Sequence, residues 1–373
     1  MAGRTFTERG MQIFDMDSHL REEYMMDEVY RLEGKFAHLT PVRLNDEKSV
    51  RAKFRHEFHP WPKEVSAHFN HSVVYDPQAN WNGGEIARRQ VGGWDMDHRL
   101  KENEKEGIDR QFLFPTQLSI PTYTEGELGA ALARAYNNWV KKLVKGKEDR
   151  LWPIGVMPWG HPEAVVDELK HCVKTLGFKA IHLTPYSHKH TLDNPVFEKF
   201  FAEAEKLDVP LMLHPASMGE LINRYDNFFA MHVLGRPFNC TAGLIALTTG
   251  GIFERYPNLR VAFFECSAEW ILYWMHRMDD DYKRMKNGFT PKITRKPSEY
   301  LKKNCYVTCE ADERLLKLAL EEFSEDRVLM ASDYPHFDSE YPGTVHELKE
   351  RSDITDKQKQ KILSENAKEF LRL

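Results

Sequence analysis

The sequence predicts an α/β protein with a (β/α)8 TIM barrel, and three observations support this prediction. First, eight short apolar segments are bounded by Gly, Pro or charged residues, as in strands that are buried on both faces. Second, most are separated by longer segments with apolar residues three and four positions apart, which is typical of helices. Third, a chain of 373 residues is long enough for one barrel with an insertion. We therefore expect residues 1–373 to form a single domain.

The expected elements alternate along the chain. The strands comprise residues 11–17, 110–115, 151–158, 179–184, 210–214, 260–265, 304–308 and 327–333. The helices comprise residues 125–145, 162–176, 197–207, 241–255, 268–285, 313–323 and 355–373. Local signals support individual helices: Leu128, Leu132 and Ala135 share one face of the first, and Pro162 opens the second at a position where proline is favoured. Strand and helix repeated to eight strands predict a parallel barrel.

One connection is much longer than the others. Residues 20–109 separate the first two strands and are rich in His, Trp, Pro and Asn. A structureless loop of this length is improbable in a compact domain. We expect an insertion, with helices around residues 22–31 and 97–106, that caps the barrel mouth. The alternative, a separate small domain, lacks enough apolar residues for a core of its own.

Composition excludes several classes of protein. The formal net charge of −5 and a pI of about 6.4 argue against a nucleic-acid-binding protein, which is usually basic. No apolar run reaches the roughly 18 residues of a membrane span, and the N-terminus lacks the apolar core of a signal peptide. The five cysteines are scattered, so no disulfide framework is expected. We therefore expect a cytoplasmic protein.

Ionisable side chains stand where the expected strands end. The first strand ends in Asp15, Asp17 and His19, which are two residues apart and would share one face of an extended segment. Buried charges of this kind are costly unless a cation compensates them. Taken alone, solvated charges at the exit of a strand explain the pattern nearly as well.

The other strand ends strengthen the case for a metal. His214 ends the fifth expected strand, Glu265 the sixth and Asp333 the eighth. Imidazoles together with carboxylates, and without thiolates, match the ligand preferences of Zn²⁺, Mn²⁺ or Fe²⁺. We expect a divalent metal, with zinc first and manganese or iron as alternatives, and allow for a second ion near Glu265.

Five segments, taken in order, resemble a branch of the amidohydrolase superfamily that includes aminocarboxymuconate semialdehyde decarboxylase and γ-resorcylate decarboxylase. They read DMDSH, GGWDMDHRLKENEKEGIDRQFLFPT, PLMLHPA, RYPNLRVAFFECSAEWILYWMHRMD and VLMASDYPHFDS. The resemblance covers most of the chain. It implies a TIM barrel whose metal ligands fall on Asp17, His19, His214 and Asp333, with Asp333 also able to handle a proton.

The chain departs from the family pattern at two strand ends. Glu265 stands where the decarboxylases place a histidine, and Asp17 stands where relatives have His or Glu. On these grounds we expect a metal-dependent hydrolase that uses a metal-activated water on a small, carboxylated or aromatic substrate. The expected catalytic residues are Asp333, Glu265 and His336, and His182 is a candidate substrate-binding residue. The alternatives are a non-oxidative decarboxylase of an aromatic or muconate-like acid and a non-catalytic metal-binding barrel.

Residues 268–285 predict a surface for self-association. The expected helix there carries Trp270, Tyr273 and Trp274, more apolar surface than a helix packed against a barrel needs. Members of the branch that the sequence resembles are often dimers. We therefore expect a homodimer.

Overall fold

The computed structural model describes residues 11–22, 25–40, 42–43, 58–59, 91–187, 189–215, 228–288, 292–336 and 338–373. Much of the predicted insertion, residues 20–109, lies outside the described residues, so its role as a cap stays a prediction. Among the helices that are described, none combines the length and the apolar character that a membrane crossing requires.

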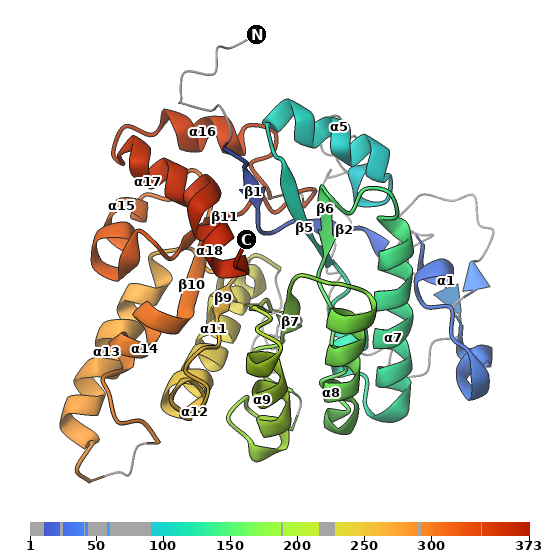
Figure 1. Ribbon diagram of the computed structural model, residues 1–373, viewed down its shortest axis with the longest axis horizontal. Helices are drawn as coiled ribbons and strands as arrows, with labels where there is room; N and C mark the ends of the chain where they lie inside the picture. The colour runs from blue at the N-terminus through green and yellow to red at the C-terminus, as the bar shows by residue number, and fades with distance from the viewer. Residues whose placement is uncertain are drawn as a thin grey trace.

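Short parallel strands form the centre of the protein (Figure 1). They are β1 (Phe14–Asp15) with its continuation β2 (His19–Leu20), β5 (Arg110–Pro115), β6 (Leu151–Pro153), β7 (Ile181–Leu183), β8 (Leu211–Leu213), β9 (Val261–Phe263), β10 (Cys305–Cys309) and β11 (Val328–Met330). One sheet has the order β1-β5-β2 with β6 paired to β5, and the other has the order β11-β10-β9-β8-β7.

Backbone hydrogen bonds close these two sheets into a ring. Gly155 forms a parallel bridge with Ile181, which joins β6 to β7. On the other side, the Met16 N–H donates to the Met330 carbonyl at 3.0 Å, which joins β1 to β11. The predicted (β/α)8 barrel is therefore confirmed, with shorter strands than the sequence predicted.

Helices surround the ring, and the bounds of most agree with the predicted segments. The helices of the barrel are α7 (Gly126–Leu143), α8 (Pro162–Lys170), α9 (Glu198–Lys206), α11 (Phe228–Thr249), α12 (Ile252–Arg255), α13 (Trp270–Met285), α14 (Pro297–Asn304), α15 (Leu316–Ala319), α16 (Thr344–Glu350), α17 (Asp356–Gln360) and α18 (Asn366–Leu371). Short π-helical turns extend α8 over His171–Thr175, α15 over Leu320–Ser324 and α17 over Lys361–Glu365. Before β5 and after it lie α1 (Met26–Val29), α5 (Met96–Glu106) and α6 (Ser119–Tyr123), and β3 (Val42–Arg43) pairs with β4 (Phe58–His59).

The main difference from the prediction lies in α11, which begins at Phe228 instead of at residue 241. Pro237 lies inside this helix, and a proline in a helix interior normally indicates a break because it lacks an N–H donor. The helix continues through it here. Helices α14 and α16 were also absent from the prediction.

The alternation of side chains along the strands separates two cores. Phe14, Phe112 and Met212 point into the barrel and form one buried cluster with aromatic and apolar side chains of the other strands. Leu113 and Leu211 lie on the opposite face and pack with the helices in a larger cluster. Side chains of alternating direction on a closed sheet produce this division.

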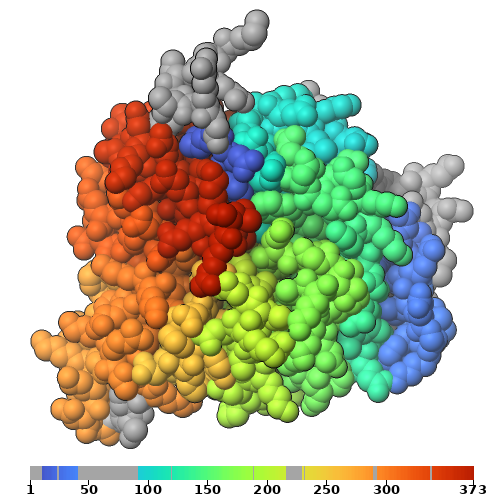
Figure 2. Space-filling model, in the orientation of Figure 1, coloured from blue at the N-terminus to red at the C-terminus, as the bar shows by residue number. Residues whose placement is uncertain are grey.

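The two ends of the described chain meet at one side of the barrel. Figure 2 shows red residues of the C-terminal region beside blue residues near the N-terminus, and β1 contacts both β11 and the π-helical turn after α17. Phe370, on α18, belongs to the inner cluster and packs against Tyr306, with ring centroids 4.9 Å apart and ring planes tilted by 60°. The last helix therefore covers part of the barrel interior.

A buried arginine ties α5 to the first strand. The Arg99 side chain is fully buried, and it donates to the Gly92 carbonyl at 2.6 Å, to Ser18 Oγ at 2.9 Å and to Gln111 Oε1 at 3.0 Å. It also donates to the carbonyl of His19. One side chain thus holds the backbone that carries His19 against the helix before β5.

We predict that Arg99→Met lowers the free energy of unfolding by about 3–5 kcal/mol, because it leaves several buried acceptors without a donor. The matched control is Lys101→Met on the same helix, where the exposed side chain should change stability by less than about 0.5 kcal/mol. Urea unfolding measures both. Equal losses in the two variants would contradict the role of Arg99.

Candidate metal centre

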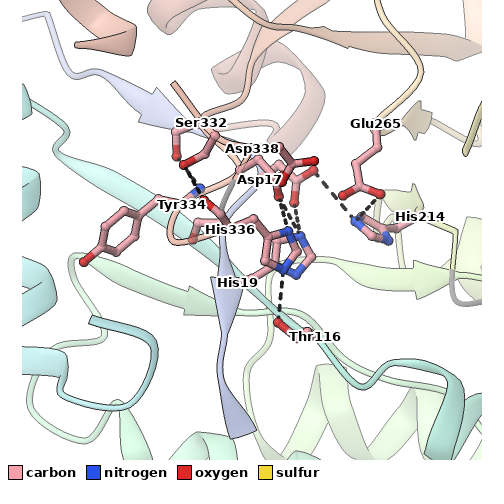
Figure 3. A network of polar contacts seen from close by, with 12 residues as sticks. Asp17, His19, Thr116, His214, Glu265, Ser332, Tyr334, His336 and Asp338 are labelled. Atoms are coloured by element: carbon pink, nitrogen blue, oxygen red, sulfur yellow. Dashed lines mark hydrogen bonds and ion pairs between the residues drawn. The ribbon is translucent and has the colours of Figure 1, made fainter. Parts of the chain in front are cut away.

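Side chains from four strands converge at the carboxyl end of the barrel. Asp17 and His19 lie on the first strand, His214 directly follows β8, Glu265 follows β9 and Asp333 follows β11. The carboxyl ends of parallel barrel strands meet at one mouth, where catalytic residues of this fold lie. Figure 3 shows Asp17, His19, His214 and Glu265 gathered at this mouth. The structure therefore brings together every residue that the sequence predicted as a metal ligand.

The distances between ligand atoms are those of a site that could hold one ion. His19 Nε2 lies 3.2 Å from Asp333 Oδ1 and 3.5 Å from Asp17 Oδ1. His214 Nε2 lies 3.6 Å from Glu265 Oε2 and 3.9 Å from Asp17 Oδ2. Two metal–ligand bonds of about 2.0–2.2 Å each can bridge separations of up to about 4.4 Å.

Several buried atoms at this mouth have no hydrogen-bond partner among the described residues. They are Asp17 Oδ1, His19 Nε2, His214 Nε2 and Glu265 Oε1. Each buried polar atom without a partner costs about 1–3 kcal/mol, and more where it is charged. A divalent cation would satisfy this set, and its mixture of imidazole nitrogen and carboxylate oxygen suits such ions.

Burial and mutual repulsion act strongly on the carboxylates. Burial raises the pKa of Asp17 well above its usual value, and the charges of Asp333 and Glu265 raise it further. Burial would also raise the pKa of Glu265, but the Arg236 guanidinium and His214 lower it to about 2. Burial and the neighbouring charges therefore oppose ionisation of Asp17, and a cation bound among these groups would favour it.

The two histidines that face the carboxylates are neutral. Burial lowers the pKa of His19 to about 3, although Asp333 opposes the shift. Burial also lowers the pKa of His214, against the opposing charge of Glu265. Neutral imidazoles are the form that binds a metal.

His336 extends the site beyond the predicted ligands. Its Nδ1 lies 2.8 Å from Asp333 Oδ1, and its Nε2 lies 3.2 Å from Thr116 Oγ1. The imidazoles of His336 and His19 are stacked with centroids 3.9 Å apart (Figure 3). Burial lowers the pKa of His336, but Asp333 outweighs this effect and raises it above its usual value.

Strained backbone places two of the carboxylates. Glu265 and Asp333 both have a φ of 54°, in the left-handed region that residues with a Cβ rarely adopt. Such conformations cost about 1–3 kcal/mol and persist where the surrounding structure imposes them, often at functional sites. The strands end by turning these two side chains toward the ring centre.

His182 lies behind His214. Its ring is fully buried, and Nε2 donates to the His214 carbonyl at 3.0 Å. His214 in turn donates from Nδ1 to the Pro215 carbonyl at 2.9 Å. In the neutral ring, Nε2 then carries no proton and has a free lone pair. The substrate-binding role of His182 stays a prediction, while its contacts are those of a residue that supports His214.

Sequence reasoning missed Arg236. Its Nε donates to Glu265 Oε2 at 2.7 Å. Arg236 lies in the part of α11 that was not predicted as helix, next to Pro237. No local pattern in the sequence indicates that this arginine faces the sixth strand.

Asp15 does not join the cluster, although its spacing predicted that it would share a face with Asp17. Its carboxylate accepts hydrogen bonds from Gln111 Nε2 at 2.7 Å and from Ser332 Oγ at 2.5 Å. Burial raises the pKa of Asp15 to about 6 in spite of these bonds. It connects the first and eighth strands beneath the metal centre.

An acidic pocket opens beside the cluster. Its lining comprises Asp17, Glu265, Ser267, Thr308, Glu310, Glu313, Ala331 and Asp333. Glu313 accepts from the backbone of Ala268 at 2.9 Å and of Glu310 at 3.0 Å, so it fixes the loops after β9 and β10.

The profile of the Amidohydrolase family matches residues 55–373. The chain belongs to the amidohydrolase family. The match covers all of the strand ends that carry the site except the first, and it confirms both the resemblance and the prediction that the protein is an enzyme.

The chain is also similar to individual relatives and solved structures whose names state an activity. The chain is 27% identical over 283 residues to 2-amino-3-carboxymuconate-6-semialdehyde decarboxylase of Dictyostelium discoideum, which covers 75% of this chain and 77% of the relative. The crystal structure of 5-carboxyvanillate decarboxylase from Sphingomonas paucimobilis superposes with a TM-score of 0.74 at 19% identity, over 97% of this chain and 99% of that one. A dihydroxybenzoic acid decarboxylase from Polaromonas sp. JS666, with bound manganese and the inhibitor 2-nitroresorcinol, gives a TM-score of 0.66 at 19% identity, with 97% of each chain covered.

The predicted hydrolase is wrong. The relatives are decarboxylases, which supports the alternative that the sequence left open. The prediction rested on two ligand-type exchanges at strand ends, Asp17 and Glu265. Both side chains nevertheless lie in the same cluster as the other ligands, so these exchanges do not indicate a different reaction.

We predict that His19→Ala and His214→Ala each abolish tight binding of a divalent metal while the barrel stays folded. Both rings present an unpaired Nε2 to the carboxylates, and removing a ligand atom leaves the ion with an incomplete set. Elemental analysis measures the metal-to-chain ratio, and circular dichroism checks the fold. A full complement of metal in either variant would remove that residue from the ligand set.

A pH prediction follows from His182. Burial lowers its pKa in the folded protein to about 3, from about 6.5 in the unfolded chain. As the pH falls below about 6.5, the unfolded chain binds a proton that the folded protein excludes, so stability is lost toward pH 3. Relative to His182→Gln, which cannot titrate, metal-free wild type should lose roughly 1.4 kcal/mol per pH unit in this window. Urea unfolding at several pH values measures the free energy of unfolding of both proteins. If it changes with pH equally in the two proteins between pH 6.5 and 4.5, the prediction is wrong.

Proposed function

We propose that this protein is a divalent-metal-dependent, non-oxidative decarboxylase of a small aromatic or muconate-like carboxylic acid. The observation that carries the proposal is the cluster of unpaired, buried ligand atoms at the carboxyl ends of the barrel strands. The decarboxylases to which the chain is similar support the choice of reaction.

In this proposal the metal is held by Asp17, His19, His214 and Asp333. A bound divalent metal supplies a Lewis acid that holds the substrate carboxylate and a neighbouring hydroxyl oxygen. The sequence favoured zinc, but carboxylate-rich sites suit manganese, and a solved neighbour contains manganese. We therefore propose manganese as the native ion, with zinc as the alternative, and elemental analysis of purified protein tests the choice.

His336 is the proposed proton donor. Its Nδ1 faces Asp333 at 2.8 Å, and Thr116 Oγ1 lies 3.2 Å from its Nε2, so the ring is held on both sides. The reaction requires one proton on the carbon that bears the carboxylate. That carbon keeps the electron pair of the broken C–C bond when CO₂ departs. Glu265 stays ionised beside Arg236, and this argues against Glu265 as the donor.

Assembly and location belong to the same proposal. Tyr273 on α13 is 65% exposed, and Trp274 beside it is half-buried, whereas Ile271 of the same helix is buried in the core. We propose a cytoplasmic homodimer that uses this outer face, with no nucleic acid or membrane as partner. Light scattering that finds a monomer at micromolar concentration would contradict the dimer.

Product analysis tests the reaction. With a panel of hydroxybenzoic and muconate-type acids, we expect one CO₂ per turnover and, in D₂O, one deuterium at the carbon that carried the carboxylate. No oxygen from labelled water should enter the product. Label from H₂¹⁸O in the organic product, without CO₂, would overturn the decarboxylase.

We further predict that His336→Gln lowers kcat by about 10²-fold or more, the scale of a general acid, with metal content unchanged. The control is His171→Gln, whose ring pairs with Asn138 on the outside of the barrel and should leave kcat within about twofold. Normal turnover by His336→Gln would assign the proton to another group.

A further inference from the structure

The two oxygens of the Glu265 carboxylate have different surroundings. Oε2 accepts from Arg236 Nε at 2.7 Å and lies 3.6 Å from His214 Nε2. Oε1 is buried, and no hydrogen-bond donor among the described residues reaches it. Arg236 therefore accounts for one oxygen and leaves the other without a partner.

No proton lies between His214 Nε2 and the Glu265 carboxylate. Because His214 donates from Nδ1 to the Pro215 carbonyl, its Nε2 is a lone pair. This lone pair faces a carboxylate oxygen of Glu265 at 3.6 Å and one of Asp17 at 3.9 Å. Electron-rich atoms that face one another at such distances repel, unless a cation between them binds both.

A second set of ligand atoms includes the same carboxylate. Glu265, His19, Asp333 and His336 each offer one atom, and these atoms lie within 4.8 Å of one another. Asp17, His19 and His214 form the other such set. His19 belongs to both sets, so the two sets of ligand atoms adjoin at one place in the barrel mouth.

The charges agree with this position. Asp17, Asp333 and Glu265 would contribute three negative charges when ionised, and Arg236 contributes one positive charge. The remaining two negative charges equal the charge of one divalent ion.

We propose that Glu265 is an additional ligand of the metal and that Arg236 is its positioning residue. Arg236 holds Oε2 and directs the carboxylate toward His214 and Asp17. The inference rests on the metal site of the proposed function, but it does not depend on which reaction the enzyme catalyses.

The decisive experiment is a titration of metal-free protein with Mn²⁺, in which electron paramagnetic resonance counts the free ion. Glu265→Gln should raise the Kd for Mn²⁺ by about 100-fold or more, because a ligand is lost. Glu310→Gln is the matched control, since Glu310 lines the same pocket with the same type of side chain but belongs to neither set of ligand atoms. It should raise Kd by less than about fivefold. Equal shifts in the two variants would reduce Glu265 to a nearby charge and overturn the inference.

Thermal unfolding of the metal-free proteins separates a ligand from a scaffold. If Glu265 is a ligand, removal of one of three crowded carboxylates leaves the midpoint of the metal-free protein unchanged or higher, and only the increase caused by Mn²⁺ shrinks. If the pair with Arg236 is structural, the metal-free midpoint of Glu265→Gln falls and the Kd of its folded fraction is normal. The second outcome overturns the proposal.

Arg236→Met tests the positioning role. Loss of a residue that orients a ligand should weaken Mn²⁺ binding by about 10–100-fold, and the effect should disappear in a Glu265→Gln background. If Arg236 acts only through its charge, the substitution tightens Mn²⁺ binding in both backgrounds, which contradicts positioning.

Wild-type protein that binds no Mn²⁺ would overturn the metal site together with this inference. Binding of Mn²⁺ without release of CO₂ would overturn the proposed reaction alone.

Discussion

The burial of Asp17, Glu265 and Asp333 at one end of the barrel is the constraint on which the rest of the site depends. Carboxylates at such distances repel one another, and burial removes the water that would screen them. Arg236 compensates one charge through Glu265, and neutral histidines occupy the spaces between the others. A folded chain tolerates such a cluster only with a cation or with protons, so the architecture is built around a positive ion.

The supporting structure holds these groups against their repulsion. Glu265 and Asp333 both adopt left-handed backbone, which directs their side chains inward at a local cost in free energy. Behind them, Arg99 binds the backbone of the first strand and Asp15 binds the eighth strand through Ser332. The closed ring of strands stabilises the fold, and this offsets the cost of the strained backbone at the barrel mouth. Scaffolds commonly offset the strain of an active site in this way.

Ligand identity was a poor guide to reaction type. Asp17 and Glu265 differ from the pattern of the decarboxylases that the sequence resembles, and this difference suggested hydrolysis. The relatives contradict that interpretation. Carboxylate and imidazole can both bind a divalent ion. An exchange between them therefore changes the affinity for the ion and the charge of the site without requiring a different reaction. The chemistry depends on where the proton donor and the substrate stand relative to the ion, and strand-end residues alone do not specify that.

The sequence by itself determined the barrel and most of the candidate metal centre. Buried parallel strands have a strong apolar pattern, and their carboxyl ends meet at one mouth, so Asp17, His19, His214 and Asp333 could be placed together from their positions after strands. Only the tertiary structure decided the partners of these residues. Asp15 turned to Ser332 although its spacing matched that of Asp17, because a short strand that bends into β2 does not keep strict alternation. Arg236 reached Glu265 from a helix that continues through Pro237, where the local pattern indicates a break. Contacts between side chains distant in sequence depend on how helices pack against strands. The spacing of apolar residues within one segment does not predict that packing.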